Sequence, residues 1–186
     1  AAFLLLGQVQ TALGSVDKAI ANYERSMQEN PKDVRAFILA ATLEEKRGKW
    51  QRAQELYLKA LQVRPDYPLA ANNLAFLLLE HGGNPDVALT YAQVARRGFP
   101  DEPFTADTLG WAYYRKGSYG MAADMFEEAI KKSPDNPSYH YHLGLTYAKN
   151  NNPGRAREHL EKALKIKPDY PQGDEIRKTL AQLGGG

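Results

Sequence analysis

A pattern of small residues, glycines and prolines recurs about every 34 residues along this chain of 186 residues. The pattern is complete between residues 106 and 134, where it consists of Leu109, Gly110, Tyr113, Gly117, Ala122, Phe126, Ala129 and Pro134. Apolar or small residues follow one another at helical intervals up to Gly117, and then again up to Pro134. The stretch therefore predicts two short helices that pack as a hairpin.

Each position of the pattern has a physical reason. Gly110 and Ala122 are small, which allows the two helices to cross closely. Gly117 can adopt the left-handed conformation that ends the first helix, and Pro134 follows the second helix as a stop. One hairpin cannot bury its apolar face alone, so the repetition predicts an elongated solenoid of stacked hairpins.

The pattern divides the chain into five repeats and a final helix. We place the repeats at residues 1–33, 34–67, 68–102, 103–136 and 137–170, a last helix at 171–183 and a tail at 184–186. The last helix carries Ile176, Leu180 and Leu183 on one stripe, which is typical of a cap over the open end of a solenoid. Residues 1–183 are therefore expected to form one domain.

Two repeats depart from the pattern. In the second repeat, Ala40 and Ala41 replace the Leu-Gly pair and Glu44 replaces the aromatic residue, so its first helix is expected to pack less fully. In the fifth repeat, Asn151 stands where glycine would end the first helix. Asparagine is the residue that tolerates the left-handed conformation next best.

These spacings resemble the tetratricopeptide repeat (TPR) family over essentially the whole chain. The resemblance implies an all-α, right-handed superhelical solenoid whose first helices line a concave groove for a partner protein or peptide. The family's groove positions correspond here to Arg35, Asn72, Phe76, Leu79, Phe104, Asp107, Trp111, Tyr114, Arg115, Tyr141, Leu145 and Lys149. The same positions also supply Ile38, Thr42, Glu45, Lys46, Glu80 and Ala148.

The aromatic residues in the middle of this groove have two interpretations. Trp111 and Tyr114 lie three residues apart on one helix, with Phe76 on the neighbouring first helix. They could form an anchor pocket for an apolar side chain or an extended peptide. Alternatively, a tightly wound superhelix could bury them against the adjacent helix.

Composition excludes several classes of protein. The 24 basic and 22 acidic residues nearly balance, which leaves little net positive potential to attract nucleic acid. No apolar run approaches the roughly 20 residues of a membrane-spanning helix. The absence of cysteine excludes disulfides and thiolate metal sites.

No arrangement of side chains in the sequence indicates catalysis, a metal or a cofactor. His140 and His142 point away from each other on a helix, His81 and His159 stand alone, and no nucleophile lies beside a base. The Lys and Asn set with which some TPR proteins bind a chaperone's C-terminal carboxylate is also missing. We therefore expect a non-catalytic interaction scaffold.

Residues 72–183 also resemble the C-terminal region of bacterial TPR proteins of exopolysaccharide-export and exosortase (PEP-CTERM) systems. This second resemblance rests on Asn72–Ala75, Asp107–Trp111, Tyr141–Gly144 and the following helix. It implies a scaffold in a bacterial envelope assembly, periplasmic or membrane-associated rather than cytoplasmic. Leu6 and Gly7 already lie in register with a first helix, so we expect a fragment of a longer protein. The alternatives are a self-association module and the regulatory arm of a larger enzyme.

Overall fold

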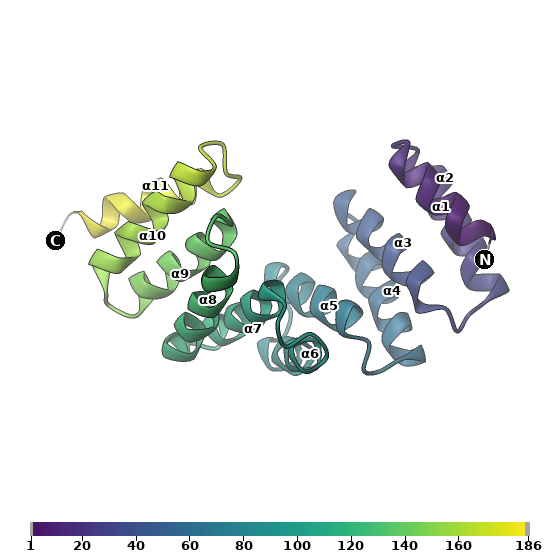
Figure 1. The fold of residues 1–186 in the computed structure, drawn as a ribbon, viewed down its shortest axis with the longest axis horizontal. Helices are drawn as coiled ribbons and strands as arrows, with labels where there is room; N and C mark the ends of the chain where they lie inside the picture. Colours follow the sequence, from purple (N-terminus) through teal and green to yellow (C-terminus); the bar gives the residue numbers. More distant parts are fainter. Residues whose placement is uncertain (1, 185–186) are drawn as a thin grey trace.

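The computed structural model describes residues 2–184, and within that range it contains eleven α-helices and no strand. The helices are α1 (Ala2–Ala12), α2 (Val16–Glu29), α3 (Val34–Lys46), α4 (Trp50–Val63), α5 (Pro68–Glu80), α6 (Pro85–Gly98), α7 (Pro103–Arg115), α8 (Tyr119–Lys132), α9 (Pro137–Lys149), α10 (Pro153–Ile166) and α11 (Gly173–Leu183). Consecutive helices pack as five hairpins, and α11 packs on α10 and α9. The hairpins follow one another along an arc with α1 and α11 at opposite ends (Figure 1). The prediction of an all-α solenoid is confirmed.

The turn inside each hairpin ends the first helix with a left-handed residue. Gly117 has φ of 77°, and the amide of Ser118 donates to the carbonyl of Tyr113 at 2.9 Å across it. Asn151 has φ of 58° at the equivalent place in the last hairpin. The expectation that Asn151 replaces the usual glycine is therefore confirmed.

The helices of a hairpin approach closely where the sequence has glycine. A Cβ added at Gly144 would lie 2.6 Å from Cγ of Leu160, and one added at Gly110 would lie 2.8 Å from Cε1 of Phe126. Both distances are far below van der Waals contact. Leu160 and Phe126 are completely buried, so these glycines make room for the main apolar side chains of the second helices.

In α3, Phe37, Ile38, Ala40 and Ala41 are all buried. Contact between α3 and the next first helix, α5, is nevertheless slighter than the contact between α5 and α7, which agrees with the expectation that α3 packs less fully against its neighbours. Glu44 is buried as well, and its Oε2 lies 3.9 Å from Arg47 Nη1. The methylene groups of Glu44 thus fill part of the space of the missing aromatic residue, and its carboxylate lies near Arg47.

The two ends of the solenoid differ. At the C-terminal end, Ile176 of α11 is completely buried, and Leu180 and Leu183 pack against the same core. At the other end, Leu5 and Leu13 of the α1 region are 63% and 70% exposed. Apolar surface is therefore covered by α11 and left open on α1. None of the described helices combines the length and apolar character needed to cross a bilayer.

Candidate partner-binding groove

Two cavities adjoin on the face of the solenoid formed by the first helices of the hairpins. The cavity between α3, α5 and α7, here the proximal cavity, has a volume of about 480 Å³ and includes Glu45, Asn72, Phe76 and Phe104. The cavity between α5, α7, α9 and the start of α11, here the distal cavity, has a volume of about 570 Å³. Phe76 and Asp107 line both. The two cavities therefore lie next to each other and share part of their walls, and together they are called the groove here.

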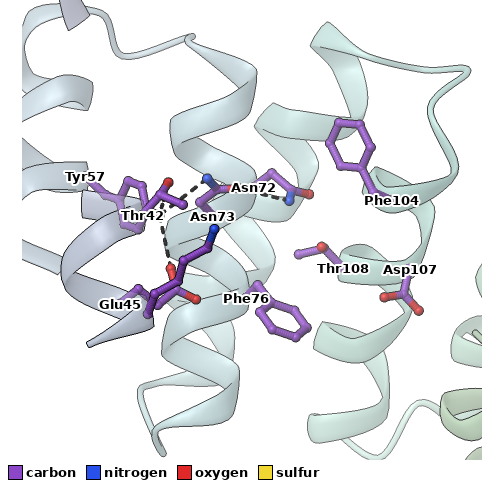
Figure 2. A pocket seen from close by; sticks show the side chains of 10 residues that line it. Thr42, Glu45, Tyr57, Asn72, Asn73, Phe76, Phe104, Asp107 and Thr108 are labelled. Atoms are coloured by element: carbon purple, nitrogen blue, oxygen red, sulfur yellow. Dashed lines mark hydrogen bonds between the residues drawn. The ribbon is translucent and has the colours of Figure 1, made fainter. Parts of the chain in front are cut away.

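A polar network covers one wall of the proximal cavity (Figure 2). Tyr57 lies at its centre, and its hydroxyl donates to Oε2 of Glu45 at 3.1 Å. Nδ2 of Asn73 donates to the same hydroxyl at 3.4 Å, and Nδ2 of Asn72 donates to Oδ1 of Asn73 at 3.5 Å. The network thus joins α3, α4 and α5 and fixes the orientation of both amides.

Burial changes the acid–base behaviour of this network. It raises the pKa of the Glu45 carboxyl above its ordinary value, against the hydrogen bond from Tyr57, which lowers the pKa. Burial also raises the pKa of the Tyr57 phenol. Burial is the main cause of both shifts, and hydrogen bonds are worth more in such partly buried surroundings than in water.

The distal cavity is built around a stack of three rings. The Trp111 indole lies between Tyr114, at 4.6 Å between ring centroids, and His142, at 4.5 Å. Nε1 of Trp111 donates to Oε1 of Glu80 at 2.9 Å, which ties α7 to α5. Nδ1 of His142 and Oδ1 of Asp107 lie 2.7 Å apart, which ties α7 to α9. Trp111 is only 7% exposed. Its main role is therefore packing, and Tyr114 presents the more accessible ring.

The C-terminal helix completes the distal cavity. The hydroxyl of Tyr141 donates to Oε2 of Glu175 at 2.8 Å, and the hydroxyl of Tyr170 donates to Oγ of Ser138 at 3.0 Å. Burial, and after it the Glu175 carboxylate, raise the pKa of Tyr141. The helix expected only to cover the end of the core thus also contributes a side chain to the groove.

The structure brings together most of the side chains expected in the groove. Asn72, Phe104 and Asp107 line the proximal cavity with Phe76. The distal cavity adds Trp111, Tyr114, Arg115, Tyr141 and Leu145. Arg115 donates to the carbonyl of Leu79, so its guanidinium is already engaged with α5.

Three residues of the first set expected in the groove lie elsewhere, and of the second set Ile38 is buried in the core and Ala148 lines neither cavity. The Leu79 side chain is 1% exposed and belongs to the core, because α7 covers that side of α5. Arg35 pairs with Asp33 at 2.6 Å at the start of α3, outside both cavities. Lys149 lines a separate recess of about 380 Å³ beside α11. Of these three, only Lys149 borders a hollow of the surface.

Sequence reasoning missed Tyr57, Asn73, His142 and Glu175. Tyr57 belongs to a second helix, and Glu175 belongs to the cap, so neither was considered for a groove of first helices. The pair Asn72-Asn73 was a usable signal, because two adjacent amides on a mostly apolar helix need polar partners.

The histidines do not form a metal site. Contrary to the expectation that His159 stands alone, its Nδ1 lies 2.9 Å from Nδ1 of His140. Burial, and then the neighbouring His140, lower the pKa of His159. Within residues 2–184, no three His, Asp or Glu side chains converge as metal ligands would.

Comparison with known proteins identifies the repeats. A family model described as tetratricopeptide repeat matches residues 38–103 and 108–171, and a second model of the same description matches residues 1–33. The chain is also 25% identical over 116 residues to "TPR repeat-containing protein PA4667" of Pseudomonas aeruginosa. That match covers 62% of this chain and 20% of the relative, so the chain spans about a fifth of the relative's length.

Two solved structures illustrate the likeness in fold. PilW, described as a widely conserved type IV pilus biogenesis factor, superposes with a TM-score of 0.80 at 20% identity, covering 97% of this chain and 86% of PilW. YrrB, described as a TPR protein with an unusual peptide-binding site, gives a TM-score of 0.74 at 21% identity, covering 95% and 90%. At these identities the likeness concerns the fold alone.

Proposed function

This chain belongs to the tetratricopeptide repeat family, and from that premise we propose that its groove binds an extended partner segment across the proximal and distal cavities. The family is one of protein-binding scaffolds and is not catalytic. The partner and the site of binding are the parts of the proposal that need an experiment.

The observation that carries this proposal is that the two cavities adjoin at Phe76, which lines both. An extended chain advances about 3.3 Å per residue and alternates its side chains, so it can place successive side chains in successive hollows. The walls are held by hydrogen bonds and ring stacks that exist without a ligand, such as Tyr57 with Glu45 and Trp111 with Tyr114. Binding then orders mainly the ligand, which lowers its entropic cost.

The test compares two variants in a pull-down from cell extract of the source organism. Phe76→Ala together with Tyr114→Ala removes one accessible ring from each cavity while leaving the buried Trp111 in place. Met121→Ala on α8 is the matched control, because this side chain is 51% exposed and lines neither cavity. We expect a partner to be captured by the parent and by the control and lost from the groove variant. Equal capture by all three would place binding outside the groove.

The narrower part of the proposal is that the partner belongs to a bacterial envelope assembly for polysaccharide export. Its support is the resemblance of residues 72–183 to TPR proteins of such systems. PilW, a pilus biogenesis factor, has a similar fold, but that likeness adds nothing on the pathway. Fractionated extracts test this part: capture from the envelope fraction is expected, and capture only from the cytosolic fraction would contradict it.

A second candidate function is self-association through α1, and the exposed Leu5 and Leu13 favour it. Apolar surface of this kind is suited to packing against a second copy. The test is light scattering over a range of concentrations, with Leu5→Glu and Leu13→Glu as the variant. A concentration-dependent mass that the variant abolishes would support it, and a monomeric parent would rule it out.

A further inference from the structure

We propose that the proximal cavity selects an arginine side chain of the partner segment, held by Asn72 and Glu45 and flanked by Phe76 and Phe104. The inference rests on the proposed function, since it names the residue that the groove recognises. It is drawn from the hydrogen-bonding groups that the cavity leaves unused.

The first observation is an acceptor without a donor. Oδ1 of Asn72 is buried and has no hydrogen-bond partner among the described residues, and the whole residue is 8% exposed. Its Nδ2 donates to Asn73, so the oxygen is the unpaired end of the amide of this cavity-lining residue. Figure 2 shows this amide extending from α5 toward α7, on the side where Phe104 lies. A buried carbonyl oxygen left unpaired lowers stability, and a donor from a ligand would remove that cost.

The second observation is the half-satisfied carboxylate of Glu45. Its Oε2 accepts the hydrogen bond from Tyr57, whereas within residues 2–184 no donor or ion pair is found for Oε1. Burial raises the pKa of this carboxyl and outweighs the smaller lowering effects of Tyr57, His81 and Lys46. A cation beside Glu45 would therefore gain more here than at a hydrated surface.

The hydrogen-bond donors of the network are already paired with acceptors inside it. Asn73 donates to Tyr57, Tyr57 donates to Glu45, and Asn72 donates to Asn73. What the network offers an incoming group is thus two oxygens, one neutral and one charged. The complementary group carries several N–H donors and a positive charge.

The shape and lining of the cavity favour arginine over lysine. Phe76 and Phe104 lie on α5 and α7 at the cavity, and aromatic faces stack on a planar guanidinium better than on a compact ammonium. A guanidinium also has five N–H donors in a fixed plane, enough for two separate oxygens. Asp107 also lines this cavity, but its Oδ1 already lies 2.7 Å from Nδ1 of His142, so Glu45 is the carboxylate assigned to the arginine.

Lys46 carries a positive charge that would repel an arginine in the proximal cavity. It lines the cavity, and among the described residues it is the one Lys or Arg that does so. It is exposed, and it forms neither a hydrogen bond to Asn72 nor an ion pair with Glu45 within the described residues. If the cavity took an anion, Lys46 would be its main contact; if it takes arginine, Lys46 opposes binding. The two possibilities predict opposite effects of Lys46→Ala.

The experiment uses pools of acetylated, amidated heptapeptides with a fixed central residue and mixed flanking residues. The central residue is arginine, lysine, citrulline, leucine or glutamate, and binding to the whole chain is measured by fluorescence anisotropy. We expect the arginine pool to bind best, and Glu45→Gln and Asn72→Ala each to weaken it by about tenfold. Lys46→Ala should strengthen it. Glu55→Gln on α4 is the matched control, since Glu55 is exposed and lines neither cavity.

Each outcome distinguishes the two proposals. If pools bind but citrulline or leucine equals arginine, or if Glu45→Gln has no effect, the inference is wrong and the groove still binds peptides. If the glutamate pool binds best and Lys46→Ala abolishes binding, the site is an anion site instead. If no pool binds a chain whose circular dichroism is normal, both the inference and the proposed function fail.

Discussion

Tyr57→Phe is the substitution that best tests the polar network of the proximal cavity. The Tyr57 hydroxyl donates to Glu45 at 3.1 Å and accepts from Asn73 at 3.4 Å, and the residue is completely buried. Removing the hydroxyl leaves a half-buried carboxylate without its donor. A hydrogen bond to a charged group is worth about 1.5 to 3 kcal/mol, and the long distances and partial burial place the expected loss near the lower end, about 1 to 2 kcal/mol.

Tyr23→Phe supplies the matched control. Tyr23 occupies the equivalent place in α2, is 1% exposed, and its hydroxyl lies 2.9 Å from Oγ1 of Thr11, a neutral partner. Losing a neutral hydrogen bond costs about 0.5 to 1.5 kcal/mol. The free energy of unfolding, from urea titration followed by circular dichroism, should therefore fall further for Tyr57→Phe. Equal losses would refute the idea that Glu45 depends on Tyr57.

The difference in stability between Tyr57→Phe and the parent should also depend on pH. Glu45 has a folded pKa raised above its ordinary value, so the folded state binds its proton more readily than the unfolded state does. The stability contributed in this way is present at low pH and is lost as pH rises through the folded pKa. The Tyr57 hydrogen bond favours the charged form, so the deficit of Tyr57→Phe relative to the parent should be largest near about pH 7 and shrink toward about pH 4. A deficit independent of pH would contradict this assignment.

Three further substitutions test the packing, each by thermal unfolding. Ala122→Leu should lose about 1 to 3 kcal/mol by overpacking, because Ala122 is completely buried; an unchanged midpoint would refute our helix register. Gly144→Ala should destabilise despite the better helix propensity of alanine, because its Cβ would meet Leu160 at 2.6 Å; greater stability would show that Leu160 relaxes. Ile176→Asp should detach α11 and cause aggregation, since Ile176 is completely buried; a monomeric variant that unfolds like the parent would show that α11 does not protect the core.

Much of the fold could be predicted because it depends on short-range rules. The left-handed turns at Gly117 and Asn151 and the close approach at Gly144 follow from the residue types and their spacing. At α3 the pattern was less informative. Ala40 and Ala41 are completely buried, and Glu44, which stands where the pattern has an aromatic residue, is buried as well, which periodicity alone does not predict.

The groove was harder to predict than the fold. Helical position shows which face a residue is on, and this was enough to bring Asn72, Phe76 and Phe104 together. It does not show which neighbours shield one another, so it could not decide between an accessible Trp111 and one buried between Tyr114 and His142. Nor does it show that a second helix contributes, as Tyr57 does.

The shared position of Phe76 means that the two cavities cannot act as independent binding sites. A ring that turns toward one hollow gives up space in the other, so the occupant of the first changes the volume offered to the second. Any such effect must be reciprocal, since each ligand alters the affinity of the other by the same factor. A single aromatic side chain on α5 would then make the partner's affinity depend on the combination of two side chains, rather than on the sum of two separate contacts.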